Sequence, residues 1–313
     1  MGFYERVTTF AGLPVVEHPQ KDDPLPEVDP AAVAWRVGDS DPYEPVQDWL
    51  RRFADTLGHR AVALVLGPWG EELYDNPPPV PTLVEIADKL PALRALFVGE
   101  VLGEECENSW INATEFTPLL TAYPRLETLR IRSGFRDGTT ETPLLPVRHD
   151  ALRELAIETG GLPGSVVRAV AESDLPALEH LELWLGVDEY GGDATLEDFA
   201  PILSGCRWPG LRYLGLRNAE IADQLAAAVA AAPVVARLET LDLSLGVLSD
   251  TGAAALLAGQ PLTHLRRLDL HHHFLSDEMV KRVAAELPAA DLSEQERAET
   301  SNGDVWRYTA VSE

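Results

Sequence analysis

The sequence predicts an α/β solenoid: a horseshoe with a parallel inner β-sheet, outer helices and β-rich caps at both ends. Two observations predict it. A short leucine pattern recurs along most of the chain, and apolar residues with helical spacing fill the intervals between the recurrences. The pattern Leu-x-x-Leu-x-Leu/Ile/Val begins at seven leucines, whose successive separations are 33, 26, 26, 33, 27 and 27 residues. A period this narrow indicates one repeated structural unit.

Each recurrence predicts a β-strand, because apolar residues that alternate with variable ones bury one face of a strand. The seven segments are LRALFV (93–98), LETLRI (126–131), LRELAI (152–157), LEHLEL (178–183), LRYLGL (211–216), LETLDL (238–243) and LRRLDL (265–270). Two looser matches lie upstream, AVALVL at 61–66 and AVAWRV at 32–37. The repeated region is therefore expected to run from 32 to 293.

Helices are expected between the strands, most clearly over 222–232, 250–259 and 277–287. Ser249 and Ser276 stand where an N-cap hydroxyl would accept a backbone hydrogen bond, and the run from Thr195 to Asp198 resembles a capping box. Strands pack about 4.8 Å apart, whereas helices need roughly 10 Å. A stack of such units must therefore curve, with the strands inside and the helices outside.

The two ends of the chain depart from the repeat, as the terminal units of a solenoid must. Residues 1–31 predict an N-terminal cap, with a strand over 3–16, followed by a Pro/Asp-rich loop. At the other end, 290–292 predicts a last strand and 294–313 a C-terminal cap. In that cap an Asn302-Gly303 turn leads into 304–311, which we expect to pair with the last open sheet edge. The whole of 1–313 is predicted to be a single domain.

Two segments carry a resemblance to a known family: LETLDLSLGVLSDTGAAALLAG (238–259) and LRRLDLHHHFLSDEMVKRVAAEL (265–287). They resemble leucine-rich repeat proteins of the ribonuclease-inhibitor-like subtype, and the resemblance extends over roughly 60–293. Where that family often has a ladder of asparagines, this chain has Gly186, Ala219, Gly246 and His273, with Asn218 one residue early. The whole chain, with its FAGLPV and RYTAVSE ends, also resembles an uncharacterised group of bacterial leucine-rich repeat proteins, which implies no function.

Composition excludes several classes of partner. The chain has 25 Lys+Arg against 51 Asp+Glu, a net charge of −26, which disfavours phosphate backbones and anionic membrane surfaces. No run approaches the roughly 20 apolar residues of a membrane-spanning helix. Two cysteines, Cys106 and Cys206, are too few for a disulfide framework or a thiolate zinc site. We expect a cytoplasmic protein that needs no cofactor and binds neither nucleic acid nor membranes.

The third, fifth and seventh positions of each repeat are predicted to point onto the concave face of the sheet. The first units place small and apolar residues there, such as Val65 and Phe97. Units from Leu178 onward place polar and aromatic residues there, which form the predicted binding patch: Glu182, Trp184, Tyr213, Arg217, Asp242, Asp269 and His271. Exposed Trp, Tyr and Arg are the residue types that anchor protein interfaces. The sequence therefore predicts a non-catalytic scaffold that binds a protein or peptide with the concave surface of its C-terminal half.

The character of the partner follows from two aspartates. Asp242 and Asp269 occupy equivalent positions of adjacent repeats, so they are expected about 5 Å apart. They would repel each other unless Arg217, Arg267 or a cationic ligand compensates. This favours a basic peptide or protein surface as partner, while a merely solvated acidic face remains the alternative explanation.

Two further hypotheses concern the same corner of the sheet. Ser244, His271 and the aspartates could make a hydrolase-like site, although Ser244 has neither a Gly-x-Ser-x-Gly elbow nor evident oxyanion donors. The run His271-His272-His273 is expected to be structural, since consecutive strand residues face opposite sides and cannot converge on one metal. A self-associating structural protein is the remaining alternative.

Overall fold

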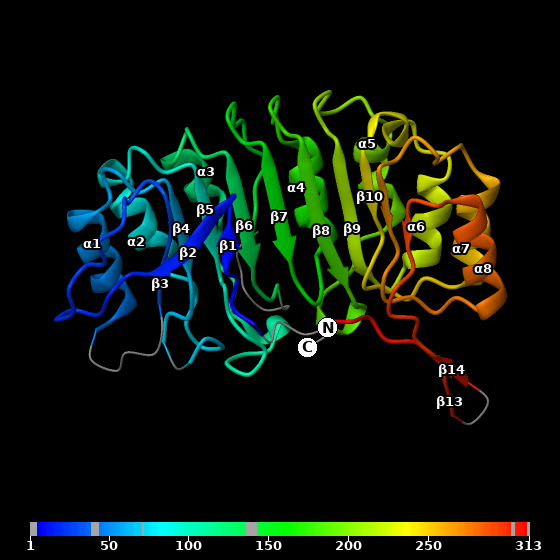
Figure 1. The fold of residues 1–313 in the computed structure, drawn as a ribbon, viewed down its shortest axis with the longest axis horizontal. Helices are drawn as coiled ribbons and strands as arrows, with labels where there is room; N and C mark the ends of the chain where they lie inside the picture. Colours follow the sequence, from blue (N-terminus) through cyan, green and yellow to red (C-terminus); the bar gives the residue numbers. More distant parts are fainter. Residues whose placement is uncertain (1–4, 39–43, 71, 136–142, 302–303, 312–313) are drawn as a thin grey trace. The chain divides into compact units, whose positions relative to one another are not determined.

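The computed structural model describes residues 5–38, 44–70, 72–135, 143–301 and 304–311. Two compact units make up the chain. The first comprises 1–157 and 172–177, and the second comprises 158–171 and 178–313. The expectation of a single domain over 1–313 stays a prediction, and the two units are described in turn (Figure 1).

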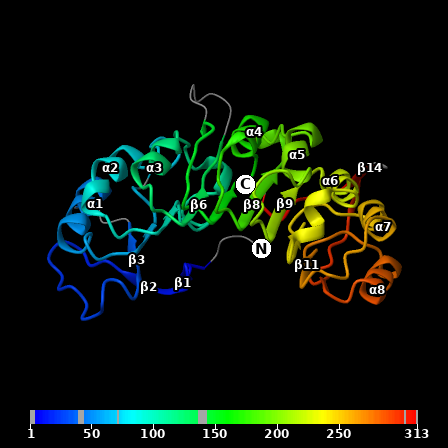
Figure 2. The same cartoon turned by 90° about the horizontal axis from the view of Figure 1, so that it is seen from above.

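In the first unit, an antiparallel pair leads into a series of parallel strands in chain order. The strands are β1 (Thr9–Phe10), β2 (Leu13–Glu17), β3 (Ala34–Val37), β4 (Ala63–Leu66), β5 (Ala95–Val98), β6 (Thr128–Arg132) and β7 (Glu154–Glu158). The helical segments are α1 (Val46–Thr56), α2 (Val80–Glu85), η1 (Ala87–Lys89), η2 (Asn108–Trp110) and α3 (Thr117–Ala122). Helices α1, α2 and α3 lie on one side of these strands (Figure 2).

In the second unit the strands are again parallel and follow chain order. They are β8 (His180–Gly186), β9 (Tyr213–Ala219), β10 (Thr240–Asp242), β11 (Arg267–Asp269) and β12 (Ala290–Asp291). The helical segments are α4 (Gly164–Glu172), η3 (Asp188–Tyr190), α5 (Leu196–Leu203), α6 (Ala222–Val229), η4 (Pro233–Arg237), α7 (Asp250–Ala258) and α8 (Asp277–Glu286). The predicted fold class, an α/β leucine-rich repeat solenoid in which parallel strands alternate with helical segments, is confirmed.

The predicted starts of the helices are confirmed as well. Ser249 and Ser276 cap α7 and α8, where their hydroxyls accept the backbone N–H of Thr251 and Met279, both at 3.2 Å. The capping box before α5 is present, with the N–H of Thr195 bonded to the Asp198 carboxylate at 2.8 Å.

In the second unit, the strand register aligns the residues that alternate with the leucines into rows across the sheet. Glu182 pairs with Gly215, Gly215 with Asp242, and Asp242 with Asp269. The leucines between them, such as Leu214 and Leu268, are at most 1% exposed. Leucines therefore fill the core beneath the helices, and the fifth positions share the opposite face, which we call the inner face.

The inner face of the first unit is covered by the protein's own N-terminal segment. Phe10 packs in one apolar cluster with Ala34, Ala63, Val65, Ala95 and Phe97, and its ring centroid lies 5.8 Å from that of Phe97. Val65 and Phe97 are fully buried. The β1–β2 hairpin thus packs on the small and apolar residues of these repeats. Removing their apolar surface from water stabilises this packing.

The C-terminal segment differs from its prediction. Residues 290–291 do form the last strand, β12, but 304–311 does not pair with that edge. Strand β14 (Asp304–Trp306) pairs instead with β13 (Glu299–Ser301) in a separate antiparallel sheet. The predicted turn at Asn302-Gly303 lies outside the described residues.

The segment after β14 crosses the end of β9 and the turns that follow β10 and β11. The N–H of Val311 donates to Asn218 Oδ1 at 3.0 Å, the N–H of Ala310 donates to the carbonyl of Leu245 at 2.8 Å, and a ring nitrogen of His272 lies 3.1 Å from the carbonyl of Tyr308. Asn218, Leu245 and His272 all have a positive φ, between 54° and 66°. Asn218 lies within β9, and Leu245 and His272 follow the ends of β10 and β11, so a left-handed residue supplies each contact with the crossing segment.

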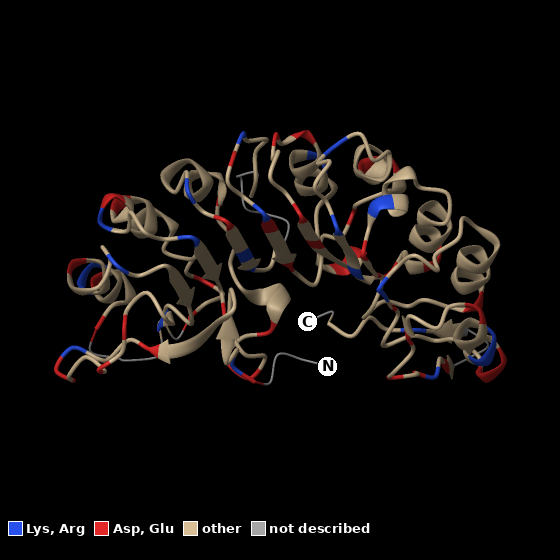
Figure 3. Ribbon diagram, turned by 45° about the horizontal axis from the view of Figure 1, so that its top comes forward, with Lys and Arg blue, Asp and Glu red and all other residues tan. Residues whose placement is uncertain are grey.

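Charged residues are spread over helices, loops and strands of both units rather than gathered on one element (Figure 3). Within the described part of the chain, no helix has the length and apolar character that crossing a bilayer requires.

Candidate functional site

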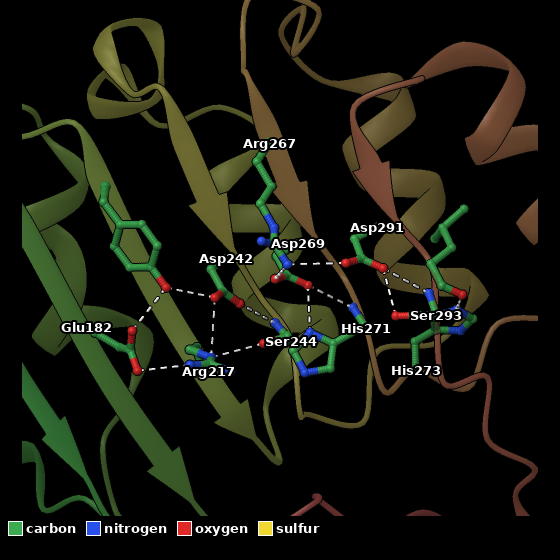
Figure 4. A network of polar contacts seen from close by, with 12 residues as sticks. Glu182, Arg217, Asp242, Ser244, Arg267, Asp269, His271, His273, Asp291 and Ser293 are labelled. Atoms are coloured by element: carbon green, nitrogen blue, oxygen red, sulfur yellow. Dashed lines mark hydrogen bonds and ion pairs between the residues drawn. The ribbon is translucent and has the colours of Figure 1, made fainter. Parts of the chain in front are cut away.

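Five of the seven predicted patch residues, Glu182, Arg217, Asp242, Asp269 and His271, lie together on the inner face of the second unit (Figure 4). Glu182 and Trp184 come from β8, Tyr213 and Arg217 from β9, and Asp242 and Asp269 end β10 and β11. They form two neighbouring groups. We call them the Arg217 cluster (Glu182, Trp184, Tyr213, Arg217, Asp242 and Ser244) and the Asp269 cluster (Arg267, Asp269, His271, Asp291 and Ser293).

Arg217 holds its cluster together. Its Nη1 lies 2.9 Å from Glu182 Oε1, and its Nε lies 3.3 Å from Asp242 Oδ2 and 2.9 Å from the hydroxyl of Ser244. The guanidinium also lies 4.9 Å above the centre of the Trp184 ring. These contacts compensate the carboxylates as the sequence anticipated, and cation–π attraction adds to them.

Trp184 is not exposed, contrary to the prediction. It is 5% exposed and lies beneath Arg217, while its indole N–H donates to Glu182 Oε1 at 2.7 Å. An indole with both a buried ring and a bonded N–H is a structural support. Tyr213, Arg217 and His271 are half-buried, so their outer faces are what a partner would meet.

Tyr213 links the two carboxylates of the cluster. Its hydroxyl oxygen lies 3.0 Å from Glu182 Oε2 and 2.7 Å from Asp242 Oδ2. Its ring stacks on His180 with centroids 3.7 Å apart. Gly215 leaves room for this ring, since a Cβ there would lie 3.0 Å from the tyrosine. Sequence reasoning gave no role to His180 or Gly215, although both stand at inward positions of the repeat.

In the Asp269 cluster, one carboxylate receives three donors. Asp269 bonds to the ring and backbone nitrogens of His271 at 2.7 and 3.1 Å and to Arg267 at 2.7 Å. Arg267 also reaches Asp291 at 3.2 Å. The hydrogen bond that His271 donates to the Asp269 carboxylate raises the pKa of His271. Burial opposes ionisation of Asp269, but the bonds from His271 outweigh it and hold its pKa below the ordinary value.

A local hydrogen bond recurs at the ends of the last three strands. Asp242, Asp269 and Asp291 each accept the backbone N–H two residues later, at 3.0, 3.1 and 3.1 Å. Such turns compete with the sheet ladder, and β10, β11 and β12 all end at these aspartates. Strand β9 is longer than these strands, so Arg217 still lies within a strand and faces the residues at which its neighbours end.

In the hydrolase-like corner, the described side-chain contacts of Ser244 and His271 go to Arg217 and Asp269, not to each other. Ser244 is fully buried, and its hydroxyl accepts a hydrogen bond from Arg217. The described ring contact of His271 goes to Asp269. A serine nucleophile needs a base at hydrogen-bond distance and access for its substrate. No observation here favours this hypothesis, and the absence of catalysis stays a prediction.

The three consecutive histidines have three separate partners. His271 bonds to Asp269, His272 contacts the carbonyl of Tyr308, and His273 contacts the carbonyl of Leu292 at 3.0 Å. His273 is fully buried and also accepts the N–H of Leu275 at 3.2 Å. These contacts give the run a structural role at the last repeats.

No protein-family model and no curated protein matches the chain. Among solved structures, an internalin (InlF) of Listeria monocytogenes is 13% identical over 85% of this chain and 82% of that chain, with a TM-score of 0.31. A protein of Bacteroides fragilis is 30% identical and superposes with a TM-score of 0.77. The match covers 89% of this chain and 77% of that chain. The chain therefore belongs to the same family as the Bacteroides fragilis protein.

Proposed function

We propose that the protein is a non-catalytic scaffold, which binds a protein or peptide partner on the inner face of its second unit. One observation carries the proposal. Tyr213 and Arg217 present their outer faces while their polar atoms are already bonded to buried Glu182 and Asp242. Side chains held in this way lose little conformational entropy when a partner arrives. Tyrosine and arginine are also residue types on which interfaces depend.

The charge of this face favours a basic partner. Four carboxylates (Glu182, Asp242, Asp269 and Asp291) stand with two guanidinium groups, those of Arg217 and Arg267. Complementary charge speeds association and selects partners. The net charge of −26 argues against nucleic acids and anionic membranes as partners.

We also propose the finer assignments. The repeat separations of 26 to 33 residues support the ribonuclease-inhibitor-like subtype. Cys106 and Cys206 are free thiols, and Cys206 is exposed, which suits a reducing compartment such as a bacterial cytoplasm.

The test begins with capture of partners from lysate and their identification by mass spectrometry. The affinity of the identified partner is then measured for wild type, Asp291→Lys and the control Glu239→Lys. Both changes reverse one exposed carboxylate, with side chains 36% and 42% exposed, but only Asp291 belongs to the Asp269 cluster. We expect Asp291→Lys to weaken binding about tenfold or more, as unfavourable charge at an interface does. Equal affinity of the two variants would contradict the proposed surface.

A further inference from the structure

The hydroxyl of Tyr213 stands between two buried carboxylates. Glu182 and Asp242 are 5% and 4% exposed, and their Oε2 and Oδ2 atoms lie 3.0 and 2.7 Å from the tyrosine oxygen. Both separations are hydrogen-bond distances. The three residues come from consecutive strands β8, β9 and β10, so the bridge is built into the sheet register.

The number of hydrogens in this bridge is one too few. A tyrosine hydroxyl has a single proton, and an ionised carboxylate only accepts. Tyr213 can therefore donate to one carboxylate, which leaves the other contact as two oxygens without a hydrogen between them. Arg217 does not fill this gap, because its Nε is 3.3 Å from Asp242 Oδ2 and donates to Ser244 at 2.9 Å.

The charge of the Arg217 cluster has the same deficit. Glu182 and Asp242 carry two negative charges if both are ionised, and Arg217 supplies one positive charge. His180, whose Nε2 lies 3.6 Å from Glu182 Oε2, adds a second positive charge only if it is protonated. Asp269 adds a further carboxylate on the neighbouring strand, where His271 and Arg267 already pair with it. A buried like-charged pair is strongly disfavoured, and a bound proton relieves it.

We infer that the bridge holds one proton on the carboxyl group of Asp242, which donates to Tyr213 while Tyr213 donates to Glu182. Glu182 keeps its charge because its Oε1 receives both Trp184 at 2.7 Å and Arg217 at 2.9 Å. Each contact then has one hydrogen, and Glu182 balances Arg217. Burial raises the pKa of Asp242, as this arrangement requires.

The proton has a consequence for the inner face, one that rests on the proposed function. When pH rises through the pKa of Asp242, this face gains one negative charge. A basic partner would then bind more tightly above that pH than below it. The proton itself can be measured on the free protein without any partner.

The decisive experiment is a carbon-13 NMR titration of aspartate side-chain carboxyls in the whole protein. Asp242→Asn identifies the signal of Asp242 by its loss. We expect that signal to titrate at a higher pH than those of exposed aspartates. A signal that titrates with the exposed aspartates overturns the inference and leaves the binding test untouched.

A second measurement uses the amide as a mimic of the protonated acid. Asp242→Asn keeps a donor for Tyr213, so we expect its urea midpoint at neutral pH to equal or exceed that of wild type. Asp269→Asn is the matched control on the neighbouring strand, and we expect its midpoint to fall because Asp269 is bonded as a carboxylate. If the two midpoints fall equally, the inference is overturned.

Discussion

The inner faces of the two units are formed by residues at the same positions of the repeat, but these residues are buried in different ways. In the first unit, Val65 and Phe97 are fully buried beneath the N-terminal hairpin. In the second unit, Glu182 and Asp242 are nearly as buried, yet they are enclosed by Arg217, Tyr213 and Trp184. One face is closed by an apolar segment of the same chain, and the other by ion pairs within the sheet.

The two inner faces therefore differ in what they can bind. The first face is occupied, and Glu100 ties the covering segment in place by accepting the N–H of Val7 at 2.7 Å and pairing with Arg6 and Arg36. Glu100 is 1% exposed, so these bonds are not shared with water. The second face keeps polar groups within reach of a partner. The same repeat thus carries a structural surface and a candidate binding surface.

The largest loss of stability is expected where the β1–β2 hairpin packs on the sheet. Phe97→Ala removes a fully buried ring that contacts Phe10, and Phe→Ala changes in cores destabilise by about 4 kcal/mol. Chemical denaturation measures the loss of unfolding free energy. Val305→Ala, at a side chain that is 57% exposed, is the control. A loss similar to the control would show that the hairpin does not depend on this packing.

Removing the ion pairs of Arg217 in the second unit should cause the next largest loss of stability. Arg217→Met leaves Glu182 and Asp242 buried without their cation, which destabilises by about 3 kcal/mol. We expect the loss to shrink at acidic pH, where no ionised carboxylate is left beside position 217. Denaturation at two pH values measures it, and a pH-independent loss would contradict the ion-pair explanation.

Acid is expected to destabilise the first unit through His18, which is 1% exposed. Burial, with the nearby charge of Arg52, lowers the pKa of His18 to about 4 from 6.5. The unfolded chain therefore binds this proton first as pH falls, so stability decreases between about pH 6.5 and 4, by about 3 kcal/mol. His18→Gln keeps an acceptor for the Trp49 N–H, which now bonds His18 Nδ1 at 2.7 Å. It should remove this pH dependence, and an unchanged profile would refute the assignment.

A smaller effect is expected where the C-terminal segment crosses the second unit. Asn218 is fully buried, holds φ at 54° and bonds the backbone of Val311 as both donor and acceptor. Asn218→Ala loses these bonds and a side chain that tolerates the left-handed backbone, so we expect a loss of about 2 kcal/mol. Asn218→Gly, which keeps the backbone freedom, separates the two contributions. If neither variant loses stability, the C-terminal segment that crosses the second unit has no stabilising role.

The smallest effect concerns His271, whose pKa shift is opposite to that of His18. Its raised pKa means that its stabilising contribution is present below the unfolded pKa and is lost as pH rises through the folded pKa. NMR titration of the ring follows this directly. In Asp269→Asn we expect the pKa of His271 to fall back toward 6.5. A pKa that stays put would mean that Asp269 is not its cause.

Much of the candidate site could be predicted from the repeat. The frame placed Glu182, Asp242 and Asp269 in one inward row, and the register of β8 to β11 confirms that row. Local signals at Ser249 and Ser276 located helix starts correctly. These features depend on residues within one turn or one strand, whose spacing is visible in the sequence.

Burial was harder to predict. Trp184 was expected to be exposed but is buried. A strand pattern predicts which face of the sheet a side chain occupies, and it does not predict which other side chains cover it. The covering of Phe97 by Phe10 and the docking of Val311 on Asn218 join residues 87 and 93 positions apart. No periodicity encodes such pairs.

The sequence alone therefore determined the repeated strand–helix unit, its register and which side chains turn away from the leucines. Only the tertiary structure decided that one inner face is covered by the N-terminal segment and that the other is a closed set of ion pairs. The physical reason is that alternation is a local property of the backbone, whereas covering a surface or pairing a buried charge depends on segments brought together by the whole fold.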